Sequence, residues 1–477
     1  MGVIKFGTDG WRAVMAEEFT FENVRLVAQA IAEYINQNGM GKRGLVIGFD
    51  TRFLSSRFAD AVAEVMLGNG IPVWLTESCC PTPVTAYTTT FYKAAGAVML
   101  TASHNPPEYN GIKFIPEYGG PALPEVTDQI ERNLMRLLEG QPDGTLYRSL
   151  PLEEGYRQGA ARRIDPREEY LDHLAKSVSL EAIRQRPLKV VVDPMYGCGA
   201  GYLEEFLGRA DCQVQVIHNT CDPLFGGIAP EPMGRWLNEL KEQVTQSGAD
   251  LGLALDGDAD RYGVVDRHGR YFTANETLYL FFDYLLRTRE HRGPVARTVA
   301  TTHMLDRIAA RHRLPVVETA VGFKYISQSL RENGAVIGGE ESGGMSVFGH
   351  VPEKDGILAC ALMVEMVAAM GKDPGEMEKE IQTEYGTLAS ERLDLHTTPA
   401  EKSAISERLN GFNPADIAGY KVLEVKSVDG IKLVLEGNRW ALIRASGTEP
   451  MFRLYVEAAD SVELDRIQSA VREMLHL

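Results

Sequence analysis

The sequence lacks long hydrophobic runs and any excess of positive charge. No stretch approaches the roughly 20 apolar residues that a helix needs to cross a bilayer, and the opening residues MGVIKFGTDGWR lack the apolar core of a signal peptide. The net charge of −17 disfavours nonspecific binding to phosphate backbones or anionic membranes, which requires excess Lys and Arg. We therefore expect no nucleic-acid or membrane partner, and an anionic substrate must find a local basic pocket.

Cysteine is scarce, and several common catalytic motifs are missing. The six cysteines include no CxxC pair and show no disulfide density, which predicts mostly buried thiols in a reducing compartment, the cytoplasm. There is no GxxxxGK[ST] phosphate loop and no HExxH zinc motif. Residues 197–202 (GCGAGY) follow an apolar run, but Tyr202 stands where a dinucleotide-binding loop has its third glycine, so we expect a tight strand-to-helix turn there.

The chain is long enough for several domains, and its first part alternates helical and strand-like patterns. The length of 477 residues predicts three or four domains at roughly 150 residues each. Apolar spacing predicts helices followed by buried strands, which is typical of a mostly parallel α/β sheet. The expected helices cover 21–38, with Gly39 as a cap, 56–67 and 82–92, and the expected strands cover 44–50, 71–75 and 97–100.

Two further α/β units and one different unit follow. The Gly- and Pro-containing stretch 140–159 resembles a connector. The second unit has strands at 188–193 and 251–255, and the third has a helix at 276–287 capped by Asn275, a strand at 335–338 and a helix at 357–370. From about residue 387 closely spaced strands, a hairpin turn at Asp429-Gly430 and a helix at 461–475 predict an α+β domain. We expect domain boundaries at 1–150, 151–270, 271–386 and 387–477.

Two loops at the ends of predicted strands carry candidate chemistry. Ser103, in TASHNP, follows a strand, where α/β sheets bind ligands; its hydroxyl needs help to act as a nucleophile, and His104, Lys113 and Arg12 could supply it. An ordinary loop with a capping serine is the alternative.

The second loop, residues 256–261 (DGDADR), places three carboxylates at alternate positions after a strand. Oxygen ligands without His or Cys favour Mg²⁺ over zinc, although two such carboxylates would more often mark a solvated turn.

Two more loops suit sugar and phosphate. Residues 338–344 (GGEESGG) offer acceptors and a donor to sugar hydroxyls, yet composition alone favours a flexible acidic turn. Residues 444–450 (RASGTEP), with Arg453 beyond them, combine a guanidinium, hydroxyls and glycine amides, which favours anion binding.

These four loops, in this order and one per expected domain, closely resemble the α-D-phosphohexomutase family over the whole chain. The resemblance implies an α/β fold of four domains around a central cleft, with three similar α/β domains and a C-terminal α+β domain. It implies that Ser103 is the phosphorylated serine, that His104 and Lys113 are acid/base and electrostatic helpers, and that Arg12 is a cleft arginine. The implied metal ligands are Ser103, Asp256, Asp258 and Asp260.

The same resemblance implies how substrate is held. The matching positions are Arg261 beside the metal, Glu340 and Ser342 at the sugar hydroxyls, Arg444, Ser446, Gly447 and Thr448 at the distal phosphate with Arg453 nearby, and Lys324 in a less uniform segment. The expected activity is interconversion of hexose 1- and 6-phosphates through phosphoserine and a hexose 1,6-bisphosphate, with Mg²⁺, in a monomer or homodimer.

The identity of the sugar is the weakest part of this interpretation. Gly-Glu-Glu-Ser resembles glucose-type mutases, whereas mannose and glucosamine types often have Met, Leu or Gln at the position of Glu341. Glucose is therefore expected, with mannose or dual specificity as the alternative and glucosamine behind them. A metal-dependent phosphatase and a silent sugar-phosphate sensor are rival classes, but every expected catalytic position is filled.

Overall fold

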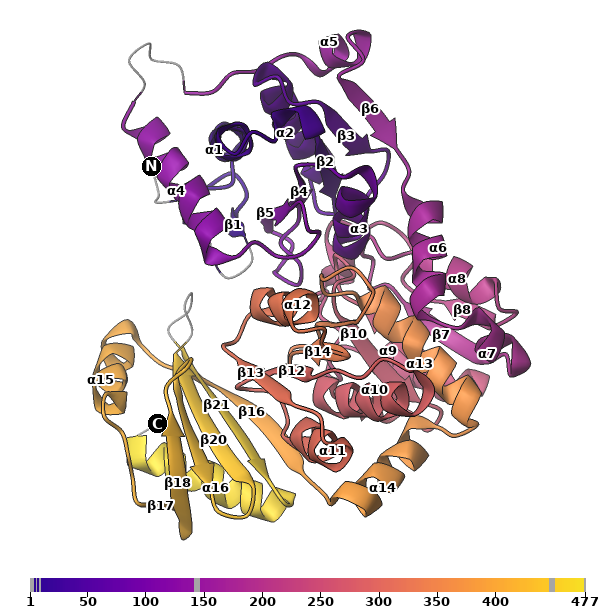
Figure 1. The fold of residues 1–477 in the computed structure, drawn as a ribbon, viewed down its shortest axis with the longest axis vertical. Coiled ribbons are helices and arrows are strands. Elements are labelled where there is room, and N and C mark those ends of the chain that lie inside the picture. The colour runs from indigo at the N-terminus through magenta and orange to yellow at the C-terminus, as the bar shows by residue number, and fades with distance from the viewer. Residues whose placement is uncertain (1–3, 6, 8–9, 141–145, 446–450, 476–477) are drawn as a thin grey trace.

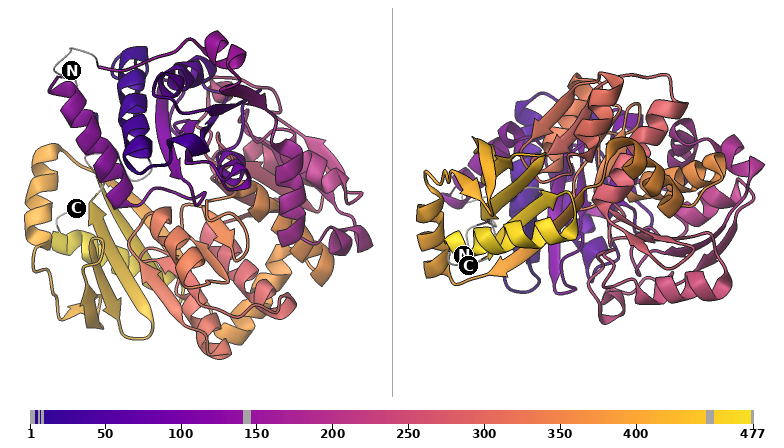
Figure 2. Two further views of the ribbon diagram at one scale, coloured as in Figure 1. Left: turned by 45° about the horizontal axis from the view of Figure 1, so that its top comes forward. Right: turned by 90° about the horizontal axis from the view of Figure 1, so that it is seen from below.

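The computed structural model describes residues 4–5, 7, 10–140, 146–445 and 451–475. These residues form four β-sheets in chain order, and the four regions follow an arc with the first and last at its ends (Figure 1). Two rotated views show the same succession (Figure 2). None of the helices in the described ranges is both long and apolar enough to cross a membrane.

The first sheet has the order β1-β5-β4-β2-β3-β6, with β2, β3, β4 and β6 parallel. Its strands are β1 (Trp11–Val14), β2 (Leu45–Phe49), β3 (Val73–Thr76), β4 (Gly96–Leu100), β5 (Tyr109–Pro116) and β6 (Ala161–Ile164). Its helices are α1 (Phe21–Gln37), η1 (Gly41–Arg43), α2 (Ser55–Gly68), α3 (Thr82–Tyr92), α4 (Pro124–Leu138) and α5 (Leu152–Arg157).

The predicted alternation in this region is confirmed. Both β2 and β4 are buried at every residue, which explains their uninterrupted apolar sequences. Helix α1 begins after Thr20, whose hydroxyl accepts from the amide of Asn23, and Gly39 follows its end with φ 70°. The expected connector instead contains α5 and leads to β6, which pairs with β3, so this sheet draws on residues beyond 150. The four boundaries themselves remain predictions.

The second sheet has the order β11-β10-β9-β7-β8, with β7, β8 and β9 parallel. Its strands are β7 (Lys189–Asp193), β8 (Gln213–Val216), β9 (Leu251–Leu255), β10 (Tyr262–Asp266) and β11 (Tyr271–Phe272). Its helices are α6 (Arg167–Ser177), α7 (Leu180–Gln185), α8 (Tyr202–Gly208), η2 (Phe225–Gly227) and α9 (Asn238–Ser247). Residues 197–201 form the expected turn before α8.

The third sheet has the order β13-β12-β14-β15. Its strands are β12 (Val295–Thr298), β13 (Val316–Thr319), β14 (Ile337–Gly339) and β15 (Met345–Val347). Its helices are α10 (Ala274–Thr288), α11 (Met304–His312), α12 (Phe323–Glu332), α13 (Gly356–Met370) and α14 (Pro374–Tyr385). Helix α13 is apolar on almost all sides because it also packs against α7, α8, β9 and β10 of the second region.

The predicted cap of α10 was wrong. Asn275 lies inside the helix, and the cap is Thr273, whose hydroxyl accepts from the amide of Glu276 while the Glu276 carboxylate accepts from the Thr273 amide. The Asn275 side chain instead accepts from the amide of Thr302. A reciprocal pair of bonds satisfies two terminal amides, which explains why the helix starts earlier than its apolar pattern.

The fourth sheet is antiparallel throughout, with the order β16-β21-β20-β19-β18-β17. Its strands are β16 (Ala389–His396), β17 (Asp416–Ile417), β18 (Tyr420–Lys426), β19 (Ile431–Leu435), β20 (Arg439–Ala445) and β21 (Met451–Ala458). Its helices are α15 (Pro399–Leu409) and α16 (Ser461–Leu475). Asp429 and Gly430 lie between β18 and β19, so the predicted hairpin and the α+β character are confirmed.

Candidate active site

Ser103 lies in the loop after β4 in an unusual backbone conformation. Its φ is 52°, in the left-handed region that a residue with a Cβ atom seldom adopts. The Ser103 amide donates to the hydroxyl of Thr101 at 2.8 Å, and the residue is 1% exposed. The strained conformation persists because the surrounding structure holds it, as is common at functional sites.

Arg52 is a major support of this loop. The residue follows β2 in the chain. Its guanidinium donates to four backbone carbonyls, those of Ser103 (2.7 Å), Asn105 (2.6 Å), Pro106 (2.7 Å) and Tyr109 (3.0 Å). The sequence analysis missed Arg52, although its place directly after a buried strand, in GFDTR, resembles that of the serine loop.

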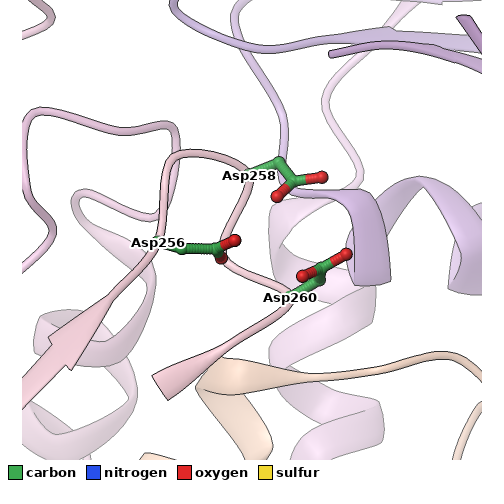
Figure 3. A group of neighbouring side chains, drawn as sticks. All are labelled: Asp256, Asp258 and Asp260. Carbon is green, nitrogen blue, oxygen red and sulfur yellow. The ribbon is translucent and has the colours of Figure 1, made fainter. Parts of the chain in front are cut away.

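The three aspartates lie on the loop between β9 and β10 and point toward one another (Figure 3). All three are completely buried, and one carboxylate oxygen from each lies within 4.8 Å of the others. The amide of Arg261 donates to Asp256 Oδ1 at 3.0 Å, and the hydroxyl of Thr82, at the start of α3, donates to Asp258 Oδ2 at 2.7 Å. The geometry therefore converges hard oxygen ligands on one point.

The serine and the aspartate loop meet directly. The Ser103 hydroxyl donates to Asp256 Oδ2 at 3.0 Å, although the two residues are 153 positions apart. The Lys113 ammonium, on β5, donates to Asp258 Oδ2 at 2.9 Å and to Asp260 Oδ2 at 3.0 Å. Lys354, two residues before α13, forms a second ion pair with Asp260 at 3.1 Å. Three regions of the chain thus contribute to one cluster.

The charges of this cluster are unevenly balanced. Burial, followed by the neighbouring Asp260 and Asp258 carboxylates, raises the pKa of Asp256 well above its usual range. At Asp258 burial acts in the same direction, but the Lys113 ammonium and hydrogen bonds outweigh it and lower the pKa. Lys113 and Lys354 therefore stabilise the negative charges of Asp258 and Asp260, whereas the charge of Asp256 is poorly compensated.

The cluster fits a bound divalent cation. Oδ1 of Asp258 and Oδ1 of Asp260 are buried and accept no hydrogen bond from the described residues. A buried acceptor without a partner is costly, and a cation would satisfy both oxygens as well as Asp256. Carboxylate and hydroxyl oxygens suit Mg²⁺, which takes oxygen ligands in an octahedron.

His104 and Arg12 flank Ser103. His104 Nδ1 lies 3.3 Å from the Ser103 hydroxyl oxygen, and burial, then the cations Arg261 and Arg12, lowers the pKa of His104 well below its usual value. The imidazole is therefore neutral at pH 7, and one of its ring nitrogens can accept a hydrogen bond. Arg12, on β1, donates to the side-chain oxygen of Asn105 at 3.0 Å in the same loop.

The third region contributes a loop after β14. Glu340 accepts from the amide of Gly322 at 2.9 Å, which places it beside the first turn of α12, where Lys324 lies. Burial, then the Glu341 carboxylate, raises the pKa of Glu340 to about 7, against the opposing effect of Lys354. Ser342 lies in the turn that closes this loop. Lys354 thus faces both Glu340 and the aspartates. The sequence analysis missed this lysine because its segment, residues 353–356 (EKDG), lies outside the four loops.

The fourth region is less directly connected to the serine. Arg444 and Arg453 are opposite each other on β20 and β21. Arg444 donates to Asp429 Oδ1 at 2.8 Å, and the other Asp429 oxygen accepts from the amide of Val321, close to Lys324. Arg453 lies 3.9 Å from Asp394. The predicted phosphate-binding residues Ser446, Gly447 and Thr448 lie outside the described residues.

Comparison with known families covers most of the chain. Four domain models match in order: "phosphoglucomutase/phosphomannomutase, alpha/beta/alpha domain" I at residues 3–140, II at 168–269 and III at 273–385, and the C-terminal domain at 402–474. Each of the four sheets lies largely within one of these matches.

Individual relatives agree along nearly their full lengths. A phosphoglucomutase/phosphomannomutase of Thermococcus kodakarensis is 32% identical over 453 residues, 95% of this chain and 94% of the relative. A Pyrococcus abyssi protein provisionally assigned as a phosphoglucosamine mutase is 34% identical over 95% of this chain and 93% of its own. A crystal structure of a Thermus thermophilus protein, provisionally assigned as a phosphomannomutase, superimposes with a TM-score of 0.86 at 34% identity over 100% of both chains. The chain therefore belongs to the phosphoglucomutase/phosphomannomutase family, and it is an α-D-phosphohexomutase.

Proposed function

We propose that this phosphohexomutase interconverts glucose 1-phosphate and glucose 6-phosphate, with Ser103 as the phosphoryl carrier. The main support is the position of the Ser103 hydroxyl, 3.0 Å from Asp256 and 3.3 Å from His104, beside Lys113 and the other two aspartates. Phosphoryl transfer depends chiefly on positioning and on cationic stabilisation of the spreading negative charge. This cluster supplies both.

The metal site would serve this transfer. Asp256, Asp258 and Asp260, together with the Ser103 oxygen, would hold Mg²⁺, which neutralises negative charge on the transferring phosphoryl group. Lys113 fixes Asp258 and Asp260 in place and adds positive charge near the serine. His104, 3.3 Å from the serine hydroxyl, would be the acid/base helper, and Arg12 donates to the Asn105 side chain of the same loop.

The substrate would be gripped at both ends. Glu340 and Ser342 would hydrogen-bond sugar hydroxyls, with Lys324 and Arg261 beside them. The nonreacting phosphate would bind to the fourth region through Arg444, Ser446, Gly447, Thr448 and Arg453. A hexose 1,6-bisphosphate would form when phosphoserine donates to the bound monophosphate, and it must turn around before it returns its other phosphate to Ser103.

Glucose is proposed because the sugar loop reads Gly-Glu-Glu-Ser. Relatives bear names for glucose, mannose and glucosamine phosphates, so the name of one relative does not decide between them. The bisphosphate must bind in two orientations, and the same loop then meets hydroxyls from both ends of the ring. Discrimination at C2 is therefore expected to be moderate, about ten- to a hundredfold, as follows from one unpaired buried acceptor.

The test is a comparison of kcat/KM for glucose, mannose and glucosamine 1-phosphates, with the matching 1,6-bisphosphate and Mg²⁺ present. We expect glucose to be preferred and mannose to be used more slowly. An Asp258→Asn variant should lose activity most strongly at low Mg²⁺, whereas Asp211→Asn, an exposed carboxylate of the second region, should not. A preference for mannose or glucosamine would overturn the substrate, and release of inorganic phosphate instead of product would indicate a phosphatase.

A further inference from the structure

Two thiols from different regions lie next to each other, in the loops after β3 and β8. Cys79 follows β3 of the first sheet and Cys221 follows β8 of the second, 142 positions later in the chain. Their sulfur atoms are 3.7 Å apart. Cys221 is exposed and Cys79 is half-buried, so an oxidant in solution can reach the pair.

The two sulfur atoms lie at contact distance, 3.7 Å apart, so little motion separates them from a bond. An S–S bond requires about 2.05 Å, and side-chain rotation can bring two sulfurs that already touch to that distance when their loops permit it. The two fully buried thiols of these two regions are engaged elsewhere. Cys80 is buried and faces Pro81, and Cys198 is buried and donates to the carbonyl of Gly257 at 3.3 Å. Cys79 and Cys221 are thus the pair arranged to react with each other.

We propose that Cys79 and Cys221 form a reversible disulfide between the first and second domains when the folded enzyme meets a peroxide. The Cys221 thiolate attacks one peroxide oxygen, the O–O bond breaks, and hydroxide leaves, which produces a sulfenic acid on Cys221. The Cys79 sulfur then attacks the Cys221 sulfur, the S–O bond breaks, and the departing hydroxide takes the Cys79 proton. Two thiols and one hydrogen peroxide yield one disulfide and two water molecules.

The order of these steps follows from the surroundings of the two thiols. Burial, then the neighbouring Cys221, raises the pKa of Cys79 to about 12, so Cys79 is a thiol at neutral pH and is a poor first nucleophile. Cys221 is exposed and meets the oxidant first. Cys79 already lies within contact distance of the sulfenic acid that forms, and it completes the bond.

The disulfide would join two loops that support the active site. The loop of Cys221 leads to Phe225, whose ring lies 5.0 Å from the Arg52 guanidinium. The loop of Cys79 leads to Thr82, which donates to Asp258. A bond that closes a long loop restricts the unfolded chain, and we expect the midpoint of thermal unfolding to rise when it forms.

Peptide mapping of the full-length enzyme tests the proposal. Reduced enzyme is treated with a stoichiometric amount of hydrogen peroxide, remaining thiols are alkylated, and tryptic peptides are analysed without reduction. Residues 58–93 and 210–235 should appear as one linked species that dithiothreitol separates, with two fewer alkylated thiols per chain. The unfolding midpoint should rise on oxidation and return on reduction.

Single substitutions identify the sulfurs, because each peptide contains two cysteines. Peptide 58–93 also contains Cys80, and peptide 210–235 also contains Cys212. Cys79→Ser and Cys221→Ser should each abolish the linked species and the rise in the midpoint, whereas Cys212→Ser, another half-buried thiol, should retain both. Mutase activity of the reduced variants shows that they are folded. A link that survives Cys79→Ser or Cys221→Ser, or oxidation of Cys221 in the folded wild type without a link to Cys79, would overturn the proposal.

Discussion

At the scale of single residues, the active site depends on side chains whose ionisation differs from that in water. Asp256 has a raised pKa, Asp258 a lowered one, and His104 is neutral, although all three belong to one buried cluster. Burial acts on each, and the nearest charges decide the outcome. The Ser103 hydroxyl therefore contacts both a neutral imidazole, that of His104, and the carboxylate of Asp256. A hydroxyl that accepts a phosphoryl group benefits from a base at this distance.

Glu340 provides a pH dependence that can be measured. Its pKa is raised to about 7, so its carboxylic acid predominates below that pH and its carboxylate above it. If the carboxylate accepts sugar hydroxyls, kcat/KM should rise between pH 6 and 8, and Glu340→Gln should lose that rise. The pH profile of kcat/KM is measured for both proteins with the same sugar phosphate. Ionisation of the substrate affects both profiles equally, so it cancels in the ratio of wild type to variant.

The neighbour of Glu340 is a matched control. Because the Glu341 charge contributes to the raised pKa, Glu341→Gln should move the rise in kcat/KM to lower pH without removing it. A Glu340→Gln variant with the same profile as the wild type would show that this carboxylate does not control binding.

At the scale of elements, the backbone of the serine loop is held by the side chain of Arg52. Arg52→Lys keeps a positive charge beside Asp50, but one ammonium cannot reproduce the planar fork that reaches four carbonyls. We expect kcat to fall about tenfold or more, since a loss of about 1.5–3 kcal/mol per charged hydrogen bond is typical, and KM to change less. Steady-state kinetics of the purified variant measure both.

Arg43 offers the comparison for that variant. It donates to the carbonyls of Lys93 (3.0 Å) and Ala94 (2.8 Å) in the same domain but away from the serine loop. Arg43→Lys should leave kcat unchanged. If both variants lost turnover equally, or Arg52→Lys kept full turnover, Arg52 would not be a positioning residue for Ser103.

The elements that could be predicted from the sequence are those whose own residues decide their structure. Strands β2, β4 and β9 are buried at every position, so continuous apolar runs reveal them. Strand β6 (ARRI) is short and mostly polar, and only its pairing with β3 makes it a strand. Sequence pattern could not supply that tertiary contact.

The same reasoning separates the site residues that were anticipated from those that were missed. Ser103 and the three aspartates share strand-end loops with small neighbours, a local signal that is visible in sequence. Thr82, Arg52 and Lys354 act through contacts with residues far away in the chain, and no local pattern distinguishes them from ordinary polar residues. Assignment of catalytic roles to any of them remains a prediction.

At the scale of the whole molecule, the fourth domain is attached to the third through buried charge. Lys432, on β19, is 1% exposed and donates to the carbonyl of Val299 at 2.7 Å and to Glu318 at 3.0 Å, with its ammonium 4.4 Å from the Trp440 ring. Burial, then Arg297, lowers the pKa of Lys432 to about 8 from its ordinary 10.5. The contact therefore carries a charge that is costly to bury.

The sign of the resulting pH dependence follows directly. Between pH 8 and 10.5 the unfolded chain binds a proton at Lys432 that the folded chain releases, so this group makes folding more favourable as pH rises through that window. The unfolding midpoint of the wild type relative to Lys432→Met should therefore rise between pH 8 and 10. Lys426→Met, which removes a more exposed partner of Glu318 but keeps Lys432, should show the same rise relative to Lys432→Met. A difference between wild type and Lys432→Met that stays constant or falls with pH would contradict this account.

The central claim is that Ser103 carries the phosphoryl group, at the point where three domains meet. The most direct measurement is intact-mass analysis, followed by peptide mapping, after metal-stripped enzyme is incubated with glucose 1,6-bisphosphate with and without Mg²⁺. We expect a gain of one phosphoryl group on Ser103 when Mg²⁺ is present, a much slower gain without it, and none in Ser103→Ala, which should also lack mutase turnover. Phosphorylation at another residue, or near-normal turnover by Ser103→Ala, would contradict the account.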